Sequence, residues 1–434
     1  MDIAHQEAIR LLESLKDYEK STCFSYEQDL RLERVGALLD RLGNPERSFQ
    51  AVHVAGTRGK GSVAAMVYSI LKASGISVGL YTSPHLVSRR ERIRITEDTF
   101  HERTIDEEEL AAGILKIQPH LEILRAQKGW EFTFFELFTV LAFCFFSERR
   151  VSHAVLEVGM GGRLDATNVV TPRVCAITPI SYDHTDKLGK TLGAIAREKA
   201  GILKKGIPAV IGPQPKEALD VIRDAARERG VPLIEVDSAY RWGVKRFDFS
   251  GQHFWVKGPN REYPDLEIPL LGEHQLENAV VALALCETLK EGSVETGFPQ
   301  VRWPGRFQIL EKDPFLVVDG AQNGASAQAL GQTLLEVFPN RPYHMILGLS
   351  EDKEIDDVCR VLCPMATEVV ATRSQSVRAL LPEELAKAVR RYCGKVEVAS
   401  NLSQALGRSR ERVTKEGVIV VTGSLYLVGE ALSL

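Results

Sequence analysis

Two repeating patterns of apolar and polar positions alternate along the first half of the chain. Apolar runs of strand type lie at residues 51–55, 75–83, 154–159, 174–181 and 208–212. Apolar positions with helical spacing lie before or between them, at residues 63–71, 131–146, 191–202 and 217–228. Residues 18–42 open with a polar segment and then show the same spacing from Leu30 to Leu42. Strands that alternate with helices predict a parallel, doubly wound α/β sheet, and such sheets bind ligands at the carboxyl ends of their strands.

The pattern changes after residue 237. Short alternating strands punctuated by Gly, Pro and Asn at residues 237–271 predict a small antiparallel appendage. A helix is expected at residues 275–289, and residues 291–299 are typical of a linker. A second α/β alternation follows, with strands at residues 315–319, 344–348, 368–371 and 417–422 and helices at residues 325–338, 356–362 and 382–392. We therefore predict two tandem nucleotide-fold-like domains, residues 1–296 and residues 297–434.

Length and composition narrow the class of protein. The chain has 434 residues, which is more than one hydrophobic core usually organises. Its formal net charge of -4 argues against a general nucleic-acid binder, because a phosphate backbone attracts a concentrated basic surface. The first 20 residues lack the apolar core of a signal peptide, and no apolar run reaches membrane-spanning length. We expect a cytoplasmic protein that binds neither nucleic acid nor membranes.

A glycine-rich segment at residues 56–62, Gly-Thr-Arg-Gly-Lys-Gly-Ser, joins the first strand to a helix. Its glycines allow backbone N–H groups to point inward around a phosphate, and the helix N-terminus adds a positive dipole end. Lys60 supplies a mobile charge for a triphosphate, and Ser62 offers a hydroxyl to a magnesium ion. Gly61 separates these two residues, so the spacing differs from the usual Walker sequence. The alternative is a glycine-rich turn that binds nothing.

Three further residues at strand ends or on the next helix are candidates for chemistry. Glu157 lies in an apolar strand, where a carboxylate is costly to bury unless it meets a cation. Mg²⁺ is the expected cation, and an ion pair with Arg163 is the alternative. His184 follows another strand, and its residue type alone leaves both a ligand role and an ordinary loop role open. The spacing of Lys199 by itself favours a surface lysine.

The second unit offers two candidates. Asp319 ends its first strand, where a carboxylate can hold a ribose hydroxyl. Arg306 can reach a phosphate across a domain cleft, although an ordinary surface arginine is the alternative. No Ser/His/Asp or Cys/His arrangement stands out as an activated nucleophile. The residues thus indicate a magnesium-nucleoside-triphosphate enzyme with its site between two α/β domains, and they leave the acceptor open.

These motifs, in this order, resemble the Mur ligase superfamily, and within it the bifunctional dihydrofolate synthase/folylpolyglutamate synthase family. The resemblance covers nearly the whole chain. Besides the phosphate loop, it rests on residues 32–34, 42–45, 82–86, 134–136, 156–168, 181–202, 274–275, 278–279, 303–306, 319–321 and 422–430.

The resemblance implies a Mur ligase central domain with the phosphate loop and a Rossmann-like Mur ligase C-terminal domain. It implies an ATP-dependent ligase that adds L-glutamate to dihydropteroate and to tetrahydrofolate or folylpolyglutamates. The carboxylate is activated as an acyl phosphate, which the α-amine of glutamate attacks. ATP and two Mg²⁺ ions are the implied cofactors, and domain closure excludes water from the acyl phosphate. The expected partners are small molecules, and the chain is expected to be a monomer.

The resemblance also assigns roles to individual residues. The implied ATP-binding residues are Gly59, Lys60, Gly61, Ser62, Asn278, Arg306 and Asp319. The implied magnesium ligands are Ser83, Glu157 and His184, to which the loop hydroxyl adds Ser62. The pterin-binding region aligns with Gln28, Asp29, Leu30, Phe135, Arg163, Leu164 and Asp165. Lys199 matches the lysine that the family carbamylates, which replaces the surface-lysine interpretation and gives a catalytic set of Lys60, Glu157, His184 and Lys199.

The chain departs from the family pattern in two motifs. Arg58 stands where asparagine is usual, while Gln322 and Gly324 stand where histidine and proline are usual. Glutamine keeps the capacity for hydrogen bonding but loses the imidazole. Two alternatives therefore stay open, a Mur-type ligase with a different carboxylate acceptor and a catalytically impaired nucleotide-binding paralogue.

Overall fold

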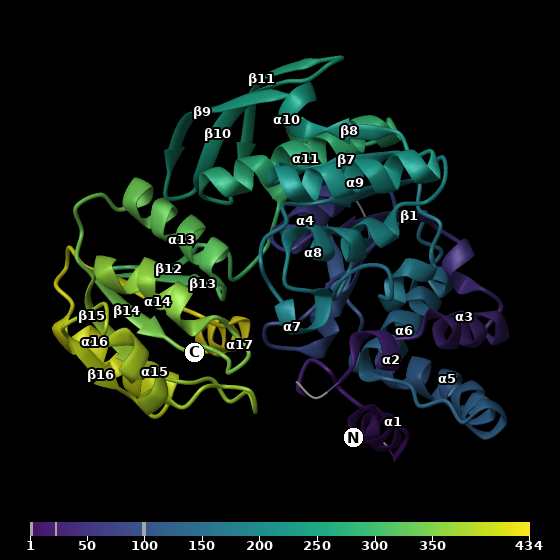
Figure 1. Ribbon diagram of the computed structural model, residues 1–434, viewed down its shortest axis with the longest axis horizontal. Coiled ribbons are helices and arrows are strands. Elements are labelled where there is room, and N and C mark those ends of the chain that lie inside the picture. The colour runs from purple at the N-terminus through teal and green to yellow at the C-terminus, as the bar shows by residue number, and fades with distance from the viewer. Residues whose placement is uncertain (1–2, 22–23, 98–100) are drawn as a thin grey trace.

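Three β-sheets organise the protein, as the computed structural model shows (Figure 1). The structure describes residues 3–21, 24–97 and 101–434. Within this part of the chain, the strands form an eight-stranded sheet, a three-stranded sheet and a six-stranded sheet. No helix in the same residues is both long enough and apolar enough to cross a membrane.

The eight-stranded sheet has the order β4-β3-β2-β5-β1-β6-β7-β8. The strands are β1 (Gln50–Ala55), β2 (Val78–Tyr81), β3 (Ile93–Thr96), β4 (Glu102–Thr104), β5 (His153–Glu157), β6 (Val174–Ile177), β7 (Ala209–Ile211) and β8 (Leu233–Glu235). The order confirms the predicted parallel α/β sheet, because β2, β5, β1, β6, β7 and β8 pair in parallel. The antiparallel edge made by β3 and β4 was not predicted.

Helices cover both faces of this sheet. They are α1 (Ile3–Ser14), α2 (Tyr26–Asp29), α3 (Leu32–Arg41), α4 (Lys60–Ala73), α5 (Glu107–Lys128), α6 (Phe134–Glu148), α7 (Thr185–Leu188), α8 (Leu192–Lys199), α9 (Lys216–Arg229) and α11 (Glu273–Leu289). Alternate residues of β1 point to opposite faces. Val52 and Val54 pack with α4 and α11, whereas Ala51 packs with α3, α5 and α6.

The antiparallel appendage is confirmed as a three-stranded sheet of β9 (Arg241–Asp248), β10 (Gly251–Lys257) and β11 (Glu262–Ile268), which follows α10 (Val236–Ala239).

The second α/β unit has the strand order β12-β13-β17-β14-β15-β16. Its strands are β12 (Gln308–Lys312), β13 (Phe315–Asp319), β14 (Tyr343–Leu347), β15 (Ala366–Ala371), β16 (Val396–Val398) and β17 (Val418–Thr422). Its helices are α13 (Gly324–Val337), α14 (Ile355–Leu362), α15 (Pro382–Val389), α16 (Leu402–Arg412) and α17 (Leu425–Leu432). The two α/β units lie side by side in Figure 1.

The helix predicted from the spacing of Leu30 to Leu42 is present as α3, after a polar segment that contains the short helix α2. Helix α2 ends at Asp29, Leu30 and Arg31 are extended, and α3 begins at Leu32. The guanidinium of Arg34 donates to the backbone carbonyl of Asp29 and forms a buried ion pair with Glu136 on α6, at 2.7 Å. These contacts hold the chain in a turn between α2 and α3, so the predicted helix begins at Leu32 rather than at Leu30.

The linker predicted at residues 291–299 is wrong. This segment contains α12 (Val294–Gly297), and both Val294 and Phe298 are buried in the core beneath α4. The Ser69 hydroxyl of α4 donates to the carbonyl of Gly297 at 2.8 Å. In the sequence, the spacing of Val294 and Phe298, two apolar residues four positions apart, already indicated a turn that packs into the core. We keep a domain boundary after residue 296 as a proposal.

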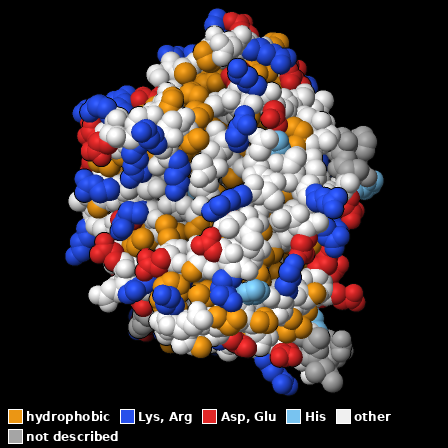
Figure 2. Space-filling view, turned by 90° about the vertical axis from the view of Figure 1, so that its right-hand side faces the viewer, with side chains coloured by type: hydrophobic (Ala, Val, Ile, Leu, Met, Phe, Trp, Pro, Cys, Tyr) orange, Lys and Arg blue, Asp and Glu red, His pale blue; other side chains and the backbone are white. Residues whose placement is uncertain are grey.

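Side chains of both charges lie on the one face of the molecule that Figure 2 presents. On the face that Figure 2 shows, Lys and Arg side chains are interspersed with Asp and Glu side chains. This mixture agrees with a net charge close to zero for a chain of this length. The expected lack of a nucleic-acid partner stays a prediction.

Helix α6 is the phenylalanine-rich helix of the sequence, and it forms the centre of one core. The Thr133 side chain accepts a hydrogen bond from the backbone N–H of Glu136, and the Glu136 carboxylate accepts one from the N–H of Thr133. This capping box satisfies N–H groups that the first helical turn leaves free. Phe138, Phe143 and Phe146 are fully buried between the sheet and α5.

We predict that Phe138→Ala lowers the free energy of unfolding by about 3–5 kcal/mol, because it removes a buried ring and leaves a cavity. Phe247→Ala is the matched control, since 46% of the Phe247 side chain is exposed and its loss should cost about 1 kcal/mol or less. Urea denaturation followed by circular dichroism measures both. Equal losses in the two variants would contradict the assigned core.

Candidate active site

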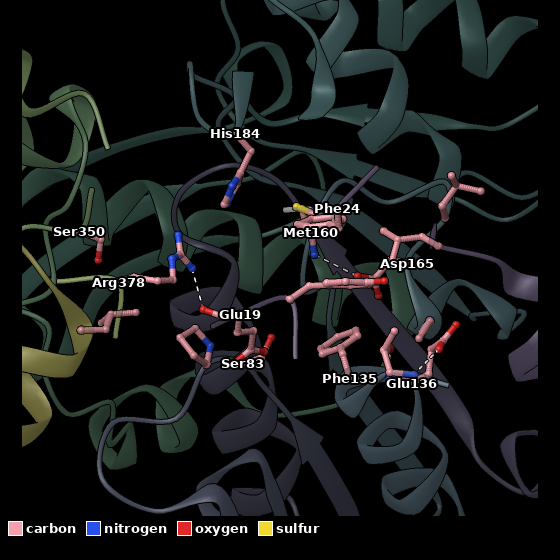
Figure 3. A pocket seen from close by; sticks show the side chains of 18 of the residues that line it. Glu19, Phe24, Ser83, Phe135, Glu136, Met160, Asp165, His184, Ser350 and Arg378 are labelled. Atoms are coloured by element: carbon pink, nitrogen blue, oxygen red, sulfur yellow. Dashed lines mark hydrogen bonds between the residues drawn. The ribbon is translucent and has the colours of Figure 1, made fainter. Parts of the chain in front are cut away.

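Two adjoining pockets lie where the two α/β units meet. The phosphate-loop pocket is lined by residues 57–62 after β1, by Glu157, and by residues 319–323 after β13. The apolar pocket is lined by residues of the N-terminal segment, α6 and the loop after β5 (Figure 3). The two pockets share six residues, which we call the junction: Ser83, Pro84, Gly159, His184, Gln322 and Leu425. A molecule in one pocket can therefore meet a molecule in the other at the junction.

The phosphate loop is held in a conformation that requires glycine. Gly56 and Gly59 both have positive φ angles, of 146° and 82°. A Cβ on Gly56 would lie 1.8 Å from the hydroxyl of Thr178, and one on Gly59 would lie 2.2 Å from Oδ1 of Asn278. Helix α4 begins at Lys60, so the loop leads directly into a helix N-terminus. This geometry fits a backbone cradle for phosphate and places Asn278 against it.

Glu157 is buried at the end of β5 and faces the phosphate-loop pocket. Its Oε2 accepts a hydrogen bond from the backbone N–H of Ser83 at 3.1 Å. The alternative ion pair with Arg163 is wrong, because Arg163 pairs with Glu198 and Glu27. Burial raises the pKa of the Glu157 carboxyl, and among the described residues no Lys or Arg forms a salt bridge with it. A buried carboxylate in this setting fits a bound cation.

All four predicted metal ligands, Ser62, Ser83, Glu157 and His184, line the phosphate-loop pocket, and their role as ligands stays a prediction. Two hydroxyls, a carboxylate and an imidazole make a mostly oxygen donor set, which fits Mg²⁺. Burial lowers the pKa of His184 to about 4, so the imidazole is neutral at pH 7 and has a free lone pair. In the described residues no three His, Cys, Asp or Glu side chains group closely enough to hold a metal. Hydroxyl, water or phosphate oxygens would therefore complete the coordination.

Lys199 lies in the last turn of α8, and the structure contradicts the surface position that spacing alone favoured. Its side chain is buried, and its Nζ donates a hydrogen bond to the carbonyl of Gly56 at 2.7 Å. Burial and the neighbouring Lys60 lower the pKa of Lys199 to about 7. The amine beside the phosphate loop therefore loses its proton much more readily than an ordinary lysine.

Asp319 and Arg306 bring the C-terminal unit to the same pocket. The carboxylate of Asp319 accepts hydrogen bonds from the backbone N–H groups of Phe307 and Ala321, both at 2.8 Å. These bonds fix the loop that follows β13. The predicted ribose contact of Asp319 and phosphate contact of Arg306 stay predictions.

A buried ion pair joins the two units beside His184. Nζ of Lys353, after β14, lies 2.9 Å from Oδ1 of Asp183, and the amide of Asn323 donates to Oδ2 of the same carboxylate. Although burial raises the pKa of Asp183, His184 and Lys353 together lower it well below its usual range. The C-terminal unit is thus anchored next to a predicted metal ligand.

Of the predicted pterin-binding residues, four line the apolar pocket: Leu30, Phe135, Leu164 and Asp165. Gln28, Asp29 and Arg163 are not among its described lining residues. The carboxylate of Asp29 instead accepts the N–H of Ser25. A direct substrate contact for these three residues stays a prediction.

The structure adds a wall to the apolar pocket that the sequence did not reveal. Glu19 forms an ion pair with the buried Arg92, and the guanidinium of Arg378 donates to the backbone carbonyl of Glu19 at 2.7 Å. Figure 3 shows Arg378 reaching from the C-terminal unit toward Glu19, below His184. Nothing in the residue spacing indicated this contact, because the partners are far apart in the chain.

Comparison with known proteins gives a consistent result. The family "Mur ligase middle domain" matches residues 54–286, and the family "Mur ligase, glutamate ligase domain" matches residues 305–425. The chain is similar to the dihydrofolate synthase/folylpolyglutamate synthase of Mycobacterium tuberculosis, with 36% identity over 94% of this chain and 90% of the relative. A solved structure of Mycobacterium tuberculosis folylpolyglutamate synthase with ADP and AMPPCP superposes with a TM-score of 0.89 at 34% identity, covering 99% and 98% of the two chains. Escherichia coli FolC in complex with DHPP and ADP superposes with a TM-score of 0.87 at 29% identity, covering 100% and 98%.

We predict that Lys353→Met weakens the docking of the two units, because the largely buried Asp183 carboxylate loses its cation and keeps only the Asn323 amide as a donor from the C-terminal unit. Removing one partner of a buried pair costs about 3–5 kcal/mol, whereas Lys387→Met, which breaks the exposed pair with Glu384, should cost about 1 kcal/mol or less. Urea unfolding at pH 7.5 measures both variants.

The pH dependence of this loss has a defined sign. Because the folded-state pKa of Asp183 is depressed, its contribution is present above the unfolded value of about 3.9 and is lost as the pH falls below it. The difference between wild type and Lys353→Met should therefore shrink when unfolding is repeated below about pH 4. A difference that is absent at pH 7.5 would contradict the buried pair.

Proposed function

This chain belongs to the Mur ligase family, in its dihydrofolate synthase/folylpolyglutamate synthase branch, and we propose that it joins L-glutamate to dihydropteroate and to tetrahydrofolate or folylpolyglutamates with ATP. The observation that carries the proposal is the junction shared by the two pockets. A phosphate cradle on one side and a pocket lined by Tyr18, Phe24 and Phe135 on the other are the parts that ATP and an aromatic carboxylic acid require. All of these residues come from one chain, so we also propose that the enzyme acts as a monomer, in the cytoplasm.

We assign the nucleotide to the phosphate-loop pocket. The proposed ATP-binding residues are Gly59, Lys60, Gly61, Ser62, Asn278, Arg306 and Asp319, all of which line it. Ser62, Ser83, Glu157 and His184 would hold Mg²⁺, which neutralises charge on a phosphoryl group in transfer. The comparison structures solved with ADP or AMPPCP support nucleotide binding in this family.

The reaction then follows from the positions of the side chains. The apolar pocket orients the acid so that its carboxylate reaches the junction at Ser83, His184 and Gln322. A carboxylate oxygen attacks the γ-phosphorus of ATP, the bond to ADP breaks, and an acyl phosphate forms. The α-amine of glutamate attacks the acyl carbon, and phosphate leaves as the amide forms. Docking through Asp183 and Lys353 keeps water away from the acyl phosphate.

Lys199 has the properties that carbamylation requires. Carbon dioxide reacts with a neutral amine, and the depressed pKa of Lys199 supplies one near neutral pH. Reaction forms an N–C bond and releases a proton, which turns the buried side chain into an anion. We propose that this anion lies beside the phosphate loop. In the unmodified side chain, the amine at this place donates a hydrogen bond to the carbonyl of Gly56.

We predict that ¹³C NMR of the protein in ¹³CO₂-enriched buffer at pH 8 shows a carbamate resonance that Lys199→Gln lacks and Lys216→Gln retains. Lys216 is the control because its side chain is 91% exposed. The resonance should fade below about pH 6, since Lys199 with a pKa of about 7 is then protonated and unreactive. An unchanged resonance in Lys199→Gln would refute the assignment.

We predict that Lys60→Ala and Glu157→Ala each lower the rate of ligation by about a thousandfold or more, because each removes a charge that acts on the phosphates or their cation. Circular dichroism should show that both variants stay folded. Lys216→Ala serves as the control on the surface. Full activity in either site variant would remove that residue from the proposed machinery.

A ligation assay with ATP and L-glutamate tests the function itself. Dihydropteroate, tetrahydrofolate and a pterin-free carboxylic acid are offered separately, and ADP and the amide product are measured. Turnover with the two pterin acids is expected. Turnover only with the pterin-free acid would favour a ligase with another acceptor, and nucleotide binding without turnover would favour a paralogue that has lost catalysis.

A further inference from the structure

A chain of buried hydrogen bonds connects the centre of β1 to the apolar pocket. Nε2 of His53 lies 2.8 Å from the hydroxyl of Thr167, and this hydroxyl lies 2.5 Å from Oδ1 of Asp165. His53 and Thr167 are completely buried, whereas Asp165 lines the pocket. Thr167 belongs to the short 3₁₀ helix η3 (Ala166–Val169), which packs against α3 and α6. No role in the proposed reaction has so far been given to His53.

The carboxylate of Asp165 is fixed from both of its oxygens. Oδ1 accepts the backbone N–H and the hydroxyl of Thr167, and Oδ2 accepts the backbone N–H of Met160 at 3.0 Å. Figure 3 shows the bond from Met160 beside the pocket. Burial raises the pKa of the Asp165 carboxyl, and the hydrogen bond from the Thr167 side chain opposes this rise. The Thr167 hydroxyl is thus one of three donors that hold the carboxylate in its orientation, beside the backbone N–H groups of Thr167 and Met160.

The protonation of His53 can be deduced from this geometry. The Thr167 hydroxyl has one proton, and a carboxylate oxygen at 2.5 Å must accept it. The hydroxyl oxygen is then an acceptor toward His53, so Nε2 of His53 must carry the N–H. Burial lowers the pKa of His53 to about 3, so the ring is neutral and Nδ1 carries no proton. This agrees with Nδ1 having no hydrogen-bond partner among the described residues, since an unpaired acceptor is less costly there than an unpaired donor.

His53 also ties the pocket to the phosphate loop. It lies three residues before Gly56, on the strand that ends in the loop, and it pairs in register with Leu156 on β5 and Cys175 on β6. A rigid strand in the centre of the sheet thus holds the phosphate cradle at one end and orders the pocket carboxylate through Thr167. In this proposal, the distance between the phosphate loop and the Asp165 carboxylate sets how far a bound acid can reach toward the γ-phosphate.

We propose that His53 is a positioning residue that, through Thr167, orients Asp165 to accept a hydrogen bond from the heterocycle of the acid substrate. Oδ1 already accepts two hydrogen bonds and Oδ2 one, so the remaining acceptor site of Oδ2 takes one N–H of the pterin ring. The proposal rests on the proposed function, because it assigns the ring end of the substrate to the apolar pocket. It makes the Nε2–H of His53 a determinant of affinity for pterin acids, without any contact with the substrate.

The test compares two amides at position 53. The amide nitrogen of His53→Gln can occupy the place of Nε2 and donate to Thr167, whereas the shorter amide of His53→Asn cannot reach it. Steady-state kinetics with dihydropteroate should give a KM about tenfold higher for His53→Asn, in line with loss of an oriented hydrogen bond to a charged group, and a KM within about twofold of wild type for His53→Gln. The KM for ATP should change less than about twofold in both, since the loop itself is untouched.

A double-mutant cycle separates positioning from a general packing effect. If His53 acts through Thr167, His53→Asn should raise the KM for dihydropteroate no further in a chain that already carries Thr167→Val. The proposal would be overturned if the two substitutions raised the KM for dihydropteroate independently, so that their fold-changes multiplied in the double variant. Equal KM values for His53→Asn and His53→Gln would also overturn it, as would loss of folded protein in both. Turnover of dihydropteroate by the wild-type chain, measured first, tests the proposed function separately, because its failure would appear before any variant is compared.

Discussion

The buried ion pair between Asp183 and Lys353 is the contact on which the geometry of this site depends. Asp183 follows β6 of the first sheet, and Lys353 follows β14 of the second, so the pair fixes one domain against the other. It lies directly beside His184, which belongs to the junction of the two pockets. Charges buried at this depth are stable only when paired, so docking of the C-terminal unit and order at the junction are coupled.

This coupling suits the acyl phosphate of the proposed reaction, which water would hydrolyse. The first domain lines the nucleotide side with the loop after β1 and the end of β5, and the C-terminal unit lines it with Arg306 and residues 319–323. The C-terminal unit adds Gln322 and Leu425 to the junction and Arg378 to the wall of the apolar pocket. A carboxylate and a triphosphate therefore meet in a closed space only when both domains are in place.

The sequence allowed the strand-end residues to be predicted, because parallel strands carry their carboxyl ends to one edge. Glu157 and His184 were found in this way, and the glycines of the phosphate loop followed from their residue types. Lys199 was misjudged by spacing alone, since its burial depends on how α8 packs against the loop after β1. The Mur ligase resemblance corrected it.

Other residues could not be predicted, for a physical reason. Glu19, Arg378 and Lys353 act through contacts between segments distant in sequence, and no local periodicity encodes such contacts. The break between α2 and α3 likewise depends on Arg34 reaching across to Glu136. The sequence did contain a signal for His53, because it is the one polar residue in the apolar run at residues 51–55. A buried polar residue in a strand implies a partner, but only the fold identifies Thr167.

The central claim is that the acid carboxylate is phosphorylated at the junction before glutamate attacks. Ligation with dihydropteroate labelled with ¹⁸O in its carboxylate, followed by ³¹P NMR of the released phosphate, tests this claim most directly. Transfer of one ¹⁸O atom to each phosphate is the predicted result, because the carboxylate oxygen that attacks the γ-phosphorus leaves with it. Phosphate without label, formed together with the amide product, would contradict the account.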